Sequence, residues 1–570
     1  MGKYVIGLDN GGTSTKAAIF DLSGKEIASA GRQTKVITPR SGYTERDMEE
    51  LWLANCDCVK RALLKAGTDG RDVLGIAVCG HGKGLYPWGK DGKPAYNGII
   101  STDSRAWKYP KKWHENGVYD SLRGQLCQEL MACQQVALLA WFKEHHRDVY
   151  DNIKYVFSVK DYIRYRLTGE AYSEATDISG SGLMDVKHAQ FDREILEKLG
   201  IGEVYEKLAP VRYSYDLCGT ITKEAAKLTG LLEGTPVAGG MFDIDACAVA
   251  VNVMSPDELC TIAGTWSINE YISETPVMDG SIAMNSLFAV PGYYLVEECS
   301  ATSSGNLEWF LENCMEHEHI PEGKNIYDVV NEKVDSIPPE ESEVYFLPFL
   351  YGSNAHPLGK GAFVGLTTYH DKAHMLRAVY EGVVYSHKTH IERLLSSRKP
   401  PEAVRMAGGA VNSGVWVQMF ADALGFPIET VEAKELGALG CGMAAAIAAG
   451  VYKDYKDAAE HMVHELFIQD ADVQLYRIEK LDHHTSILRI LEIGMGNVKI
   501  CIFQHGAGDG DRTRDRHAAE QSGEPLFQDL KSRTYIPADG RADHRHHYLA
   551  AHAEQLCRNR GKVPELLRRI

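Results

Sequence analysis

The segment at residues 4–21, YVIGLDNGGTSTKAAIFD, constrains the fold of this chain more than any other. Residues 4–8 are an apolar run with the length of a buried strand, and this run ends at an acid, Asp9. Residues 10–13 (NGGT) are a tight-turn signal, and residues 16–20 are predicted to form the returning strand of a β-hairpin.

This predicted hairpin has two interpretations. Gly11 and Gly12 would let backbone N–H groups approach a phosphate closely, while Thr13 and Lys16 add a hydroxyl donor and a positive charge. Asp9 would supply a hard oxygen ligand beside a phosphate-bound Mg²⁺. The alternative is an ordinary hairpin with a glycine-rich turn, and this segment alone leaves both interpretations open.

Length and composition limit the classes of protein that need to be considered. A chain of 570 residues is too long for one compact core, so two large domains are expected. The formal charge of −17 argues against a general nucleic-acid surface. No stretch has the length of a membrane span, and residues 438–451 are predicted to form a buried helix instead. Without a basic and apolar leader, a cytoplasmic location is expected.

The 13 cysteines are scattered, and the closest pair, Cys56 and Cys58, lacks the spacing of a metal site, so reduced thiols are expected. Residues 505–570 differ from the rest, with twelve Lys and Arg, ten Asp and Glu, and six His. Because these histidines have no ligand spacing, the segment is predicted to be a disordered appendage, such as the product of a frame change or a fusion.

The rest of the chain has an α/β pattern in which one motif occurs twice. Residues 259–263 form a second apolar strand candidate, which ends at Gly264-Thr265 and continues into residues 267–271. This repeats the opening order of strand, Gly-Thr turn and strand, and it indicates a duplicated architecture with a boundary near residues 246–256. Further strands are predicted at 74–79 and 155–158, and helices at 48–66 and 130–144.

A second segment with chemical content is VAGGMFDIDACAVA, residues 237–250. Apolar residues lead through two glycines to Asp243, where a helix of small residues is predicted to begin. The exposed N–H groups of a helix start would keep the Asp243 carboxylate ionised. It could be a simple helix cap, or a base that accepts the proton of a substrate hydroxyl in phosphoryl transfer. Asp245 competes for that role, but a helix would turn it away from Asp243.

One apparent motif is rejected. Residues 84–90 (GLYPWGK) nearly spell a phosphate-binding P-loop, but Asp91 stands where Ser or Thr must bind Mg²⁺, and Pro87 interrupts the loop.

Seven short motifs occur together in an order that resembles the FGGY carbohydrate kinases. They are Asp9-x-Gly-Gly-Thr13, Gly80-His-Gly-Lys-Gly84, Asp103-x-Arg105, Gly239-Gly-x-x-Asp243, Ala263-Gly-Thr265, Leu347-Pro-Phe349 and Gly408-Gly409. The resemblance spans residues 3–495. It implies an α/β fold with two actin-like (ribonuclease-H-like) domains flanking a central cleft. Residues 1–247 would form the sugar-binding domain, and residues 256–495 would form the ATP-binding domain.

The resemblance also implies roles for individual residues. Asp243 matches the catalytic base, and Asp9 would organise Mg²⁺. Residues that would bind the sugar are His81, Lys83, Asp103, Arg105 and Asp243. Residues that would bind ATP are Gly11, Gly12, Thr13, Lys16, Gly264, Thr265, Gly408, Gly409 and Asn412. Residues 416–424 are expected to form a helix lining the adenosine site, and residues 438–451 to pack behind the nucleotide.

Some of these assignments have plain alternatives. Asp103 and Arg105 could be a surface ion pair of small energetic value, Lys83 could be merely solvated, and Gly408-Gly409 could be a simple strand-to-helix turn. In addition, residues 352–355 (GSNA) replace a Gly-Glu-Arg stretch common in the family, so no role of that pair transfers here.

The expected activity is therefore ATP-dependent phosphorylation of a terminal hydroxyl of a small sugar, with Mg²⁺. The stretch at residues 302–309 (TSSGNLEW), together with Lys83, is similar to the L-xylulose kinase branch, which favours a pentulose such as L-xylulose. Alternatives are 3-keto-L-gulonate, D-xylulose, ribulose, erythritol or glycerol, or an ATP-binding protein of the same superfamily without a sugar acceptor. No nucleic-acid or membrane partner is expected, and whether the chain forms a homodimer is left open.

Overall fold

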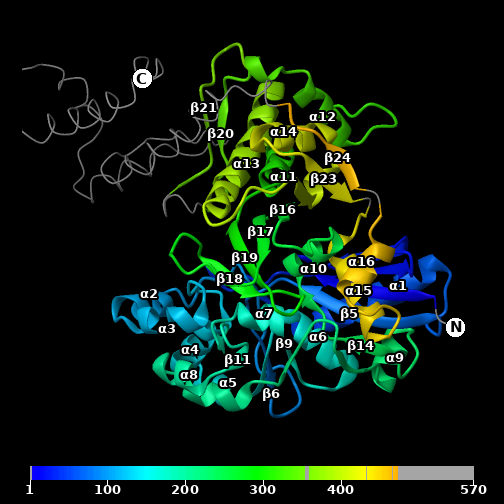
Figure 1. The fold of residues 1–570 in the computed structure, drawn as a ribbon, viewed down its shortest axis with the longest axis vertical. Coiled ribbons are helices and arrows are strands. Elements are labelled where there is room, and N and C mark those ends of the chain that lie inside the picture. The colour runs from blue at the N-terminus through cyan, green and yellow to red at the C-terminus, as the bar shows by residue number, and fades with distance from the viewer. Residues whose placement is uncertain (1–2, 353–358, 432, 465, 473–570) are drawn as a thin grey trace, which may run out of the picture. The chain divides into compact units, whose positions relative to one another are not determined.

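The computed structural model describes residues 3–352, 359–431, 433–464 and 466–472 (Figure 1). The predicted appendage at 505–570 lies outside the described residues.

The opening segment forms the predicted hairpin. β1 (Tyr4–Asn10) pairs antiparallel with β2 (Ser14–Asp21), and β1 also pairs parallel with β5 (Val73–Gly80). Its side chains from Val5 to Leu8 are buried on both faces, which explains why the run is apolar without alternation.

These strands lie in a seven-stranded sheet of the described residues, in the order β13-β14-β5-β1-β2-β3, with β15 beside β5. The other strands of this sheet are β3 (Glu26–Gln33), β13 (Leu217–Thr220), β14 (Pro236–Ala238) and β15 (Met241–Phe242). Short strands around it are β4 (Glu45–Arg46), β6 (Tyr86–Gly89), β7 (Gly98–Ile99), β8 (Ile153–Phe157), β9 (Ser173–Glu174), β10 (Met184–Asp185), β11 (Gln190–Phe191) and β12 (Val211–Arg212).

Helices surround this first sheet. α1 begins after Asp47, whose side chain accepts the N–H of Glu50, and ends at Gly67 in the left-handed conformation. The helices are α1 (Met48–Ala66), α2 (Lys108–Glu115), α3 (Val118–Leu126), α4 (Gln135–His145), α5 (Arg147–Asn152), α6 (Val159–Thr168), α7 (Ala175–Ser179), α8 (Arg193–Lys198) and α9 (Lys223–Thr229).

One helix boundary differs from prediction. The apolar pattern predicts a helix over 130–144, whereas α4 begins at Gln135. The side chain of Gln134 accepts the N–H of Met131 at 2.7 Å and donates to the carbonyl of Gly180 at 2.9 Å. These bonds hold the preceding residues in a turn, so helix formation is delayed by about one turn.

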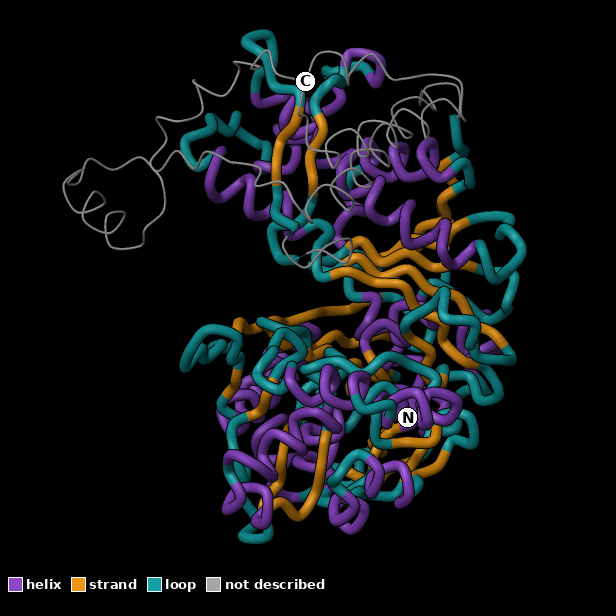
Figure 2. Tube along the Cα trace, turned by 90° about the vertical axis from the view of Figure 1, so that its left-hand side faces the viewer, coloured by secondary structure: helices purple, strands orange, loops and turns teal. Residues whose placement is uncertain are grey.

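The second sheet repeats the plan of the first. β16 (Leu259–Ala263) pairs antiparallel with β17 (Ser267–Ser273) and parallel with β22 (Val404–Ala407), as β1 does with β2 and β5. The strand order is β18-β19-β17-β16-β22-β23-β24, seven strands within the described residues. Figure 2 shows the strands of the two sheets in separate regions. The predicted duplication is thus confirmed in the strand pattern.

Further strands and α-helices lie after residue 250 in the chain. The strands are β18 (Met284–Leu287), β19 (Tyr294–Ser300), β20 (Tyr345–Leu347), β21 (Ala362–Val364), β23 (Ile428–Val431) and β24 (Leu466–Gln469). The helices are α11 (Gly305–Cys314), α12 (Ile326–Asp335), α13 (Lys372–Leu395), α14 (Gly414–Leu424) and α16 (Tyr455–Met462). Short 3₁₀ segments occur at Gly202–Lys207, Pro339–Glu341 and Gly409–Asn412.

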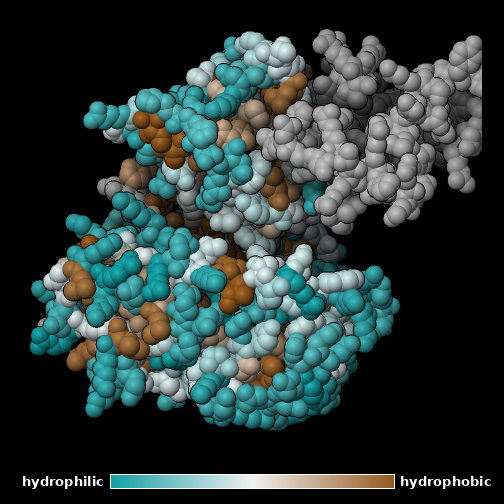
Figure 3. Space-filling view, turned by 180° about the vertical axis from the view of Figure 1, so that it is seen from behind, coloured by the Kyte–Doolittle hydropathy of each residue, from teal (hydrophilic) through white to brown (hydrophobic). Residues whose placement is uncertain are grey.

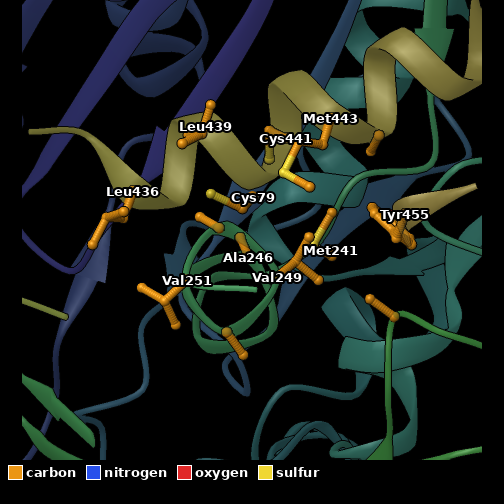
Figure 4. Packing of buried hydrophobic residues seen from close by; sticks show 14 of the residues in the cluster. Cys79, Met241, Ala246, Val249, Val251, Leu436, Leu439, Cys441, Met443 and Tyr455 are labelled. Carbon is orange, nitrogen blue, oxygen red and sulfur yellow. The ribbon is translucent and has the colours of Figure 1, made fainter. Parts of the chain in front are cut away.

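Two helices of small residues pack together between the sheets. α10 (Asp243–Ala250) leads from the first sheet to the second, and α15 (Leu436–Ala448) follows β23 in sequence. A Cβ added at Gly440 would lie 2.2 Å from the carbonyl oxygen of Ala246, so only glycine allows this approach. Figure 4 shows the side chains of this contact, with α15 above α10.

α15 also corrects a sequence prediction. It covers 436–448 instead of 438–451, and it packs on the first sheet, where a Cβ at Gly7 would lie 1.9 Å from the carbonyl of Ala438. The alanines and glycines that predict a buried helix serve this close contact with β1 and β5. The helix therefore supports the first hairpin from behind.

Apolar side chains are distributed over the surface, and Leu64 and Tyr369 are among those exposed. The face in Figure 3 is mainly hydrophilic, with hydrophobic residues in small separate groups. Within the described ranges, the helices are all too short or too polar to span a bilayer. The eleven cysteines in that part of the chain, from Cys56 to Cys441, are free thiols.

Candidate active site

The turn of the first hairpin is exposed and braced from behind. Gly12 and Thr13 are exposed and Gly11 is half-buried. The completely buried Arg46 donates to the carbonyl of Gly11 at 2.9 Å and also to that of Gly12. Because Arg46 engages the carbonyls, the turn can present its N–H groups outward, as a phosphate site requires. Sequence reasoning missed Arg46, which lies in a two-residue strand.

Arg46 also connects the hairpin to His81. The guanidinium lies near the Tyr86 hydroxyl, which is 3.0 Å from Nε2 of His81. Nδ1 of His81 is 3.2 Å from the carbonyl oxygen of Gly82. Burial and the Arg46 charge lower the pKa of His81 to about 3, so the imidazole is neutral. Both of its ring nitrogens are thus engaged within the protein.

Asp9 and Lys16 lie opposite each other on β1 and β2, one residue pair before the turn of the hairpin closes. Burial raises the pKa of Asp9, whereas the Lys16 charge lowers it. Lys16 Nζ lies 3.0 Å from the carboxylate of Glu435, which directly precedes α15. A Cβ added at Gly437 would come within 3.0 Å of Asp9 Oδ2. The start of α15 therefore touches both charged groups of the hairpin.

The turn of the second hairpin is held by hydrogen bonds from two serines. Thr265 is exposed and Gly264 is half-buried. The carbonyl of Gly264 accepts the N–H of Ser304 at 2.9 Å and its hydroxyl at 2.6 Å, and the carbonyl of Thr265 accepts the N–H of Ser303 at 3.1 Å. The stretch 302–309 thus supports the second turn.

The predicted adenosine turn lies against the second hairpin. Gly408 has φ of +93°, and a Cβ there would lie 2.6 Å from the carbonyl carbon of Ala263, so this position requires glycine. Asn412 donates to the carbonyl of Gly409 at 3.1 Å and closes the turn. α14 then begins, capped by Ser413, as predicted for residues 416–424. The structure therefore brings the predicted phosphate and adenosine turns of the second domain together.

Asp243 is the first residue of α10, as predicted, but its charge differs from the prediction. Burial, followed by the carboxyls of Asp9 and Asp177, raises the pKa of Asp243 to about 8. The N–H of Ile244 lowers the pKa, as a helix start should, but this effect is outweighed. Asp245 is completely buried and accepts the N–H of Ala289 at 3.0 Å, so it has a structural partner away from the hairpin.

A buried ion network supports the segment before Asp243. Lys160 Nζ lies 3.0 Å from Asp161, 3.2 Å from Glu174 and 3.7 Å from Asp177. Glu174 accepts the hydroxyl of Thr176, which in turn accepts the N–H of Phe242 at 2.9 Å. No sequence motif signals this network, because its members become neighbours only through the fold.

Asp103 and Arg105 are buried together instead of lying on the surface. The Arg105 side chain is 0% exposed and lies 2.8 Å from Asp103 and 2.7 Å from Glu45. The rings of Tyr43 and Trp141 flank the guanidinium at 4.1 and 5.1 Å. The surface ion-pair alternative is therefore wrong, and the pair fixes the loop, where Asp103 also accepts the N–H of Thr44 at 2.8 Å. Contact of this pair with sugar stays a prediction.

The residues present fit a phosphate-bound Mg²⁺. Among the described residues there is no group of three or more His, Cys, Asp or Glu that could hold a metal on its own. Mg²⁺ that arrives with nucleotide phosphates needs only one or two carboxylates. The Asp9 carboxyl raises the pKa of Asp243, and a divalent cation near the two groups would favour their ionised forms.

Two sheets with the same strand plan, each ending its inner hairpin in an exposed Gly-Thr turn, define a duplicated two-domain α/β fold. The sequence matches the FGGY family of carbohydrate kinases, N-terminal domain, over residues 4–250 and the corresponding C-terminal domain over residues 259–449. The chain belongs to this family.

Individual relatives agree with this assignment. The chain is 37% identical over 498 residues to the L-xylulose/3-keto-L-gulonate kinase of Escherichia coli K12, which covers 86% of this chain and 98% of the relative. It is 35% identical over 443 residues to a probable L-xylulose kinase of Pasteurella multocida, covering 78% and 90%. The crystal structure of a ligand-bound xylulose kinase from Lactobacillus acidophilus superposes with a TM-score of 0.76 at 24% identity, covering 87% and 99%, which shows the shared fold.

Proposed function

We propose that this carbohydrate kinase transfers the γ-phosphoryl group of ATP to a terminal hydroxyl of a pentulose, with L-xylulose as the first candidate. Two relatives named for L-xylulose, with which it shares 37% and 35% identity over most of the chain, support this choice. The observation that carries the chemistry is the position of Asp243 at the start of α10, within electrostatic reach of Asp9 on the first phosphate hairpin.

In this proposal Asp243 is the base. Its ionised carboxylate takes the proton of the substrate hydroxyl while that oxygen bonds to the γ-phosphorus, and the bond from this phosphorus to the β–γ bridging oxygen breaks, which leaves ADP. Mg²⁺ bound with ATP would neutralise phosphate charge, and Asp9 would hold it. Because this transfer depends mainly on positioning, the braced turns account for much of the rate.

The two turns would bind the nucleotide. Residues 11–13 and 264–265 would donate N–H groups to phosphates, and residues 408–412 would contact the adenosine. Lys16 would also bind phosphate, and its present partner, Glu435 at 3.0 Å, then has to share it. We propose the same division of the chain, with 1–247 for sugar and 256–495 for ATP. A cytoplasmic location stays a prediction.

The base assignment is tested by Asp243→Asn. This variant should lose at least about 10³-fold in kcat while it still binds sugar and ATP, because the amide cannot accept the proton and keeps the shape of the site. Sugar-dependent ADP release and calorimetric binding measure the two properties. Asp245→Asn is the matched control and should change kcat much less. Wild-type kcat in Asp243→Asn would contradict the assignment.

A second candidate substrate is 3-keto-L-gulonate, because the name of the relative from Escherichia coli includes it. A panel of L- and D-pentuloses, 3-keto-L-gulonate, erythritol and glycerol in the same assay ranks the candidates by kcat/KM. If a polyol were preferred over every pentulose, the proposed substrate class would be wrong.

A further inference from the structure

Glu297 comes from the second domain, yet its carboxylate lies beside a predicted sugar-binding residue of the first. It is on β19, which pairs with β17 and β18 of the second sheet. Its Oε2 atom is 4.0 Å from Nζ of Lys83, and the two side chains are 3% and 12% exposed. Glu297 belongs to none of the seven sequence motifs.

The placement of Glu297 is fixed by contacts between β18 and the first domain. The N–H of Leu287 donates to the hydroxyl of Ser179 at 2.9 Å, at the end of α7. The side chain of Asn285 donates to the carbonyl of Cys127 at 2.8 Å. Because β18 is anchored in this way, the neighbouring β19 is held where Glu297 meets Lys83.

The loop that carries Lys83 is equally constrained. Lys83 has φ of +63°, a left-handed conformation that is unfavourable for a residue other than glycine. A Cβ at Gly82 would lie 2.4 Å from the ring of Phe242, so the loop presses directly against the residue before Asp243. Lys83 Nζ lies 5.3 Å from the centre of that ring. A backbone strained in this way at a site is expected where the side chain has a fixed task.

The groups around Lys83 are predominantly acidic. Glu297 and Asp177 act on its ammonium, as do the thiols of Cys133 and Cys299. Lys83 also lowers the pKa of Asp243, so the ammonium lies within electrostatic reach of the proposed base. One positive charge thus stands among three carboxyl groups. A substrate carboxylate would have to displace Glu297 from Lys83 and approach like charges, whereas a neutral hydroxyl meets neither obstacle.

We propose that Glu297 is a specificity-determining residue that holds Lys83 and thereby favours uncharged ketoses over sugar acids. This inference rests on the proposed function, because it concerns the sugar site of that reaction. Glu297 acts through Lys83 and is a positioning residue: it sets how much of the ammonium's charge is available to a substrate.

The test compares L-xylulose with 3-keto-L-gulonate, which carries a carboxylate, on the full chain. For the wild type, kcat/KM should be higher for L-xylulose. Glu297→Gln should raise the acid-to-neutral ratio of kcat/KM at least tenfold, mainly through a lower KM for the acid, because Lys83 is freed. In a Lys83→Met background, Glu297→Gln should give no such gain.

Glu298→Gln is the matched control. It removes the same charge from the next residue of β19, where Glu298 binds His390 at 3.1 Å on the other face of the strand. The ratio should stay at the wild-type value in this variant. If Glu297→Gln does not fold, Glu297→Asp shortens the side chain and should shift the ratio in the same direction by a smaller amount.

Calorimetric binding of both sugars, without ATP, separates this inference from the proposed function. An unchanged or lower acid-to-neutral binding ratio in Glu297→Gln, or no binding of either sugar, overturns the inference. Binding that changes as expected in a chain that releases no ADP with any sugar overturns the proposed function and supports the inference.

Discussion

The two inner hairpins have the same strand plan, but a charged side chain holds the turn of one and neutral groups hold the turn of the other. In the first, the buried cation Arg46 binds the turn carbonyls, and Asp9 and Lys16 place charges beside the turn. In the second, Ser303 and Ser304 bind the turn carbonyls with neutral groups. The comparison shows that two turns of the same plan differ in charge, and that the charged side chains are concentrated around the first.

Asp9→Asn should have the largest effect among changes to the two hairpins. We expect kcat to fall by about 10²–10³-fold, as for the loss of one group that stabilises the transition state, while sugar binding is retained. Sugar-dependent ADP release at saturating substrate measures the change. Asp21→Asn, at the outer end of β2, is the control and should keep wild-type kcat. An equal loss in both variants would show a general defect of the hairpin.

Arg46→Met tests the charged brace. The bonds from a charged donor to the two turn carbonyls would be lost, so kcat/KM for MgATP should fall by about 10- to 100-fold. Arg61→Met removes a comparable bond to the carbonyl of Gly31 at an exposed site, 2.7 Å long, and should leave kcat/KM unchanged. Unaltered kinetics in Arg46→Met would remove the basis for the contrast between the hairpins.

The pH dependence sharpens the contrast further. With a pKa of about 8 in the free protein, Asp243 is mostly protonated below that pH and cannot accept the substrate proton. We therefore expect kcat/KM for sugar to rise with pH and then level off. Because the Asp9 carboxyl raises the pKa of Asp243, Asp9→Asn should move the rising limb to lower pH. Ser304→Ala should leave the limb in place, and an equal displacement in both variants would contradict this account.

Ser304→Ala should have the smallest effect on the rate. It removes the hydroxyl bond to the carbonyl of Gly264 but keeps the N–H bond to the same atom. The loss of one neutral bond corresponds to about fivefold in kcat/KM for MgATP. Steady-state kinetics with varied MgATP measure it. A loss larger than that of Arg46→Met would reverse the proposed division between the hairpins.

The sequence allowed the strands, the duplicated hairpins and the family to be predicted, because these depend on local patterns such as residues 4–21 and the order of short motifs. It did not reveal Arg46, Glu435 or Glu297, which meet their partners only after folding. It also predicted an ionised Asp243, because the position of a residue at a helix start can be read from the local sequence. The burial of Asp243 and its proximity to Asp9 depend on the tertiary structure and cannot be read in this way. The placement of α15 on the first sheet was missed for the same reason.

The close contact of α10 and α15 bears on how variants of this protein should be read. Any side chain at Gly440 meets the backbone of Ala246, so even alanine there would force the two helices apart and is expected to destabilise the fold. At Gly12 and Gly264, by contrast, an added Cβ has no atom within 4 Å. In a library of natural or random variants, depletion at Gly440 would report on the folded state, whereas depletion of alanine at Gly12 or Gly264 would report on the ligand that approaches those turns.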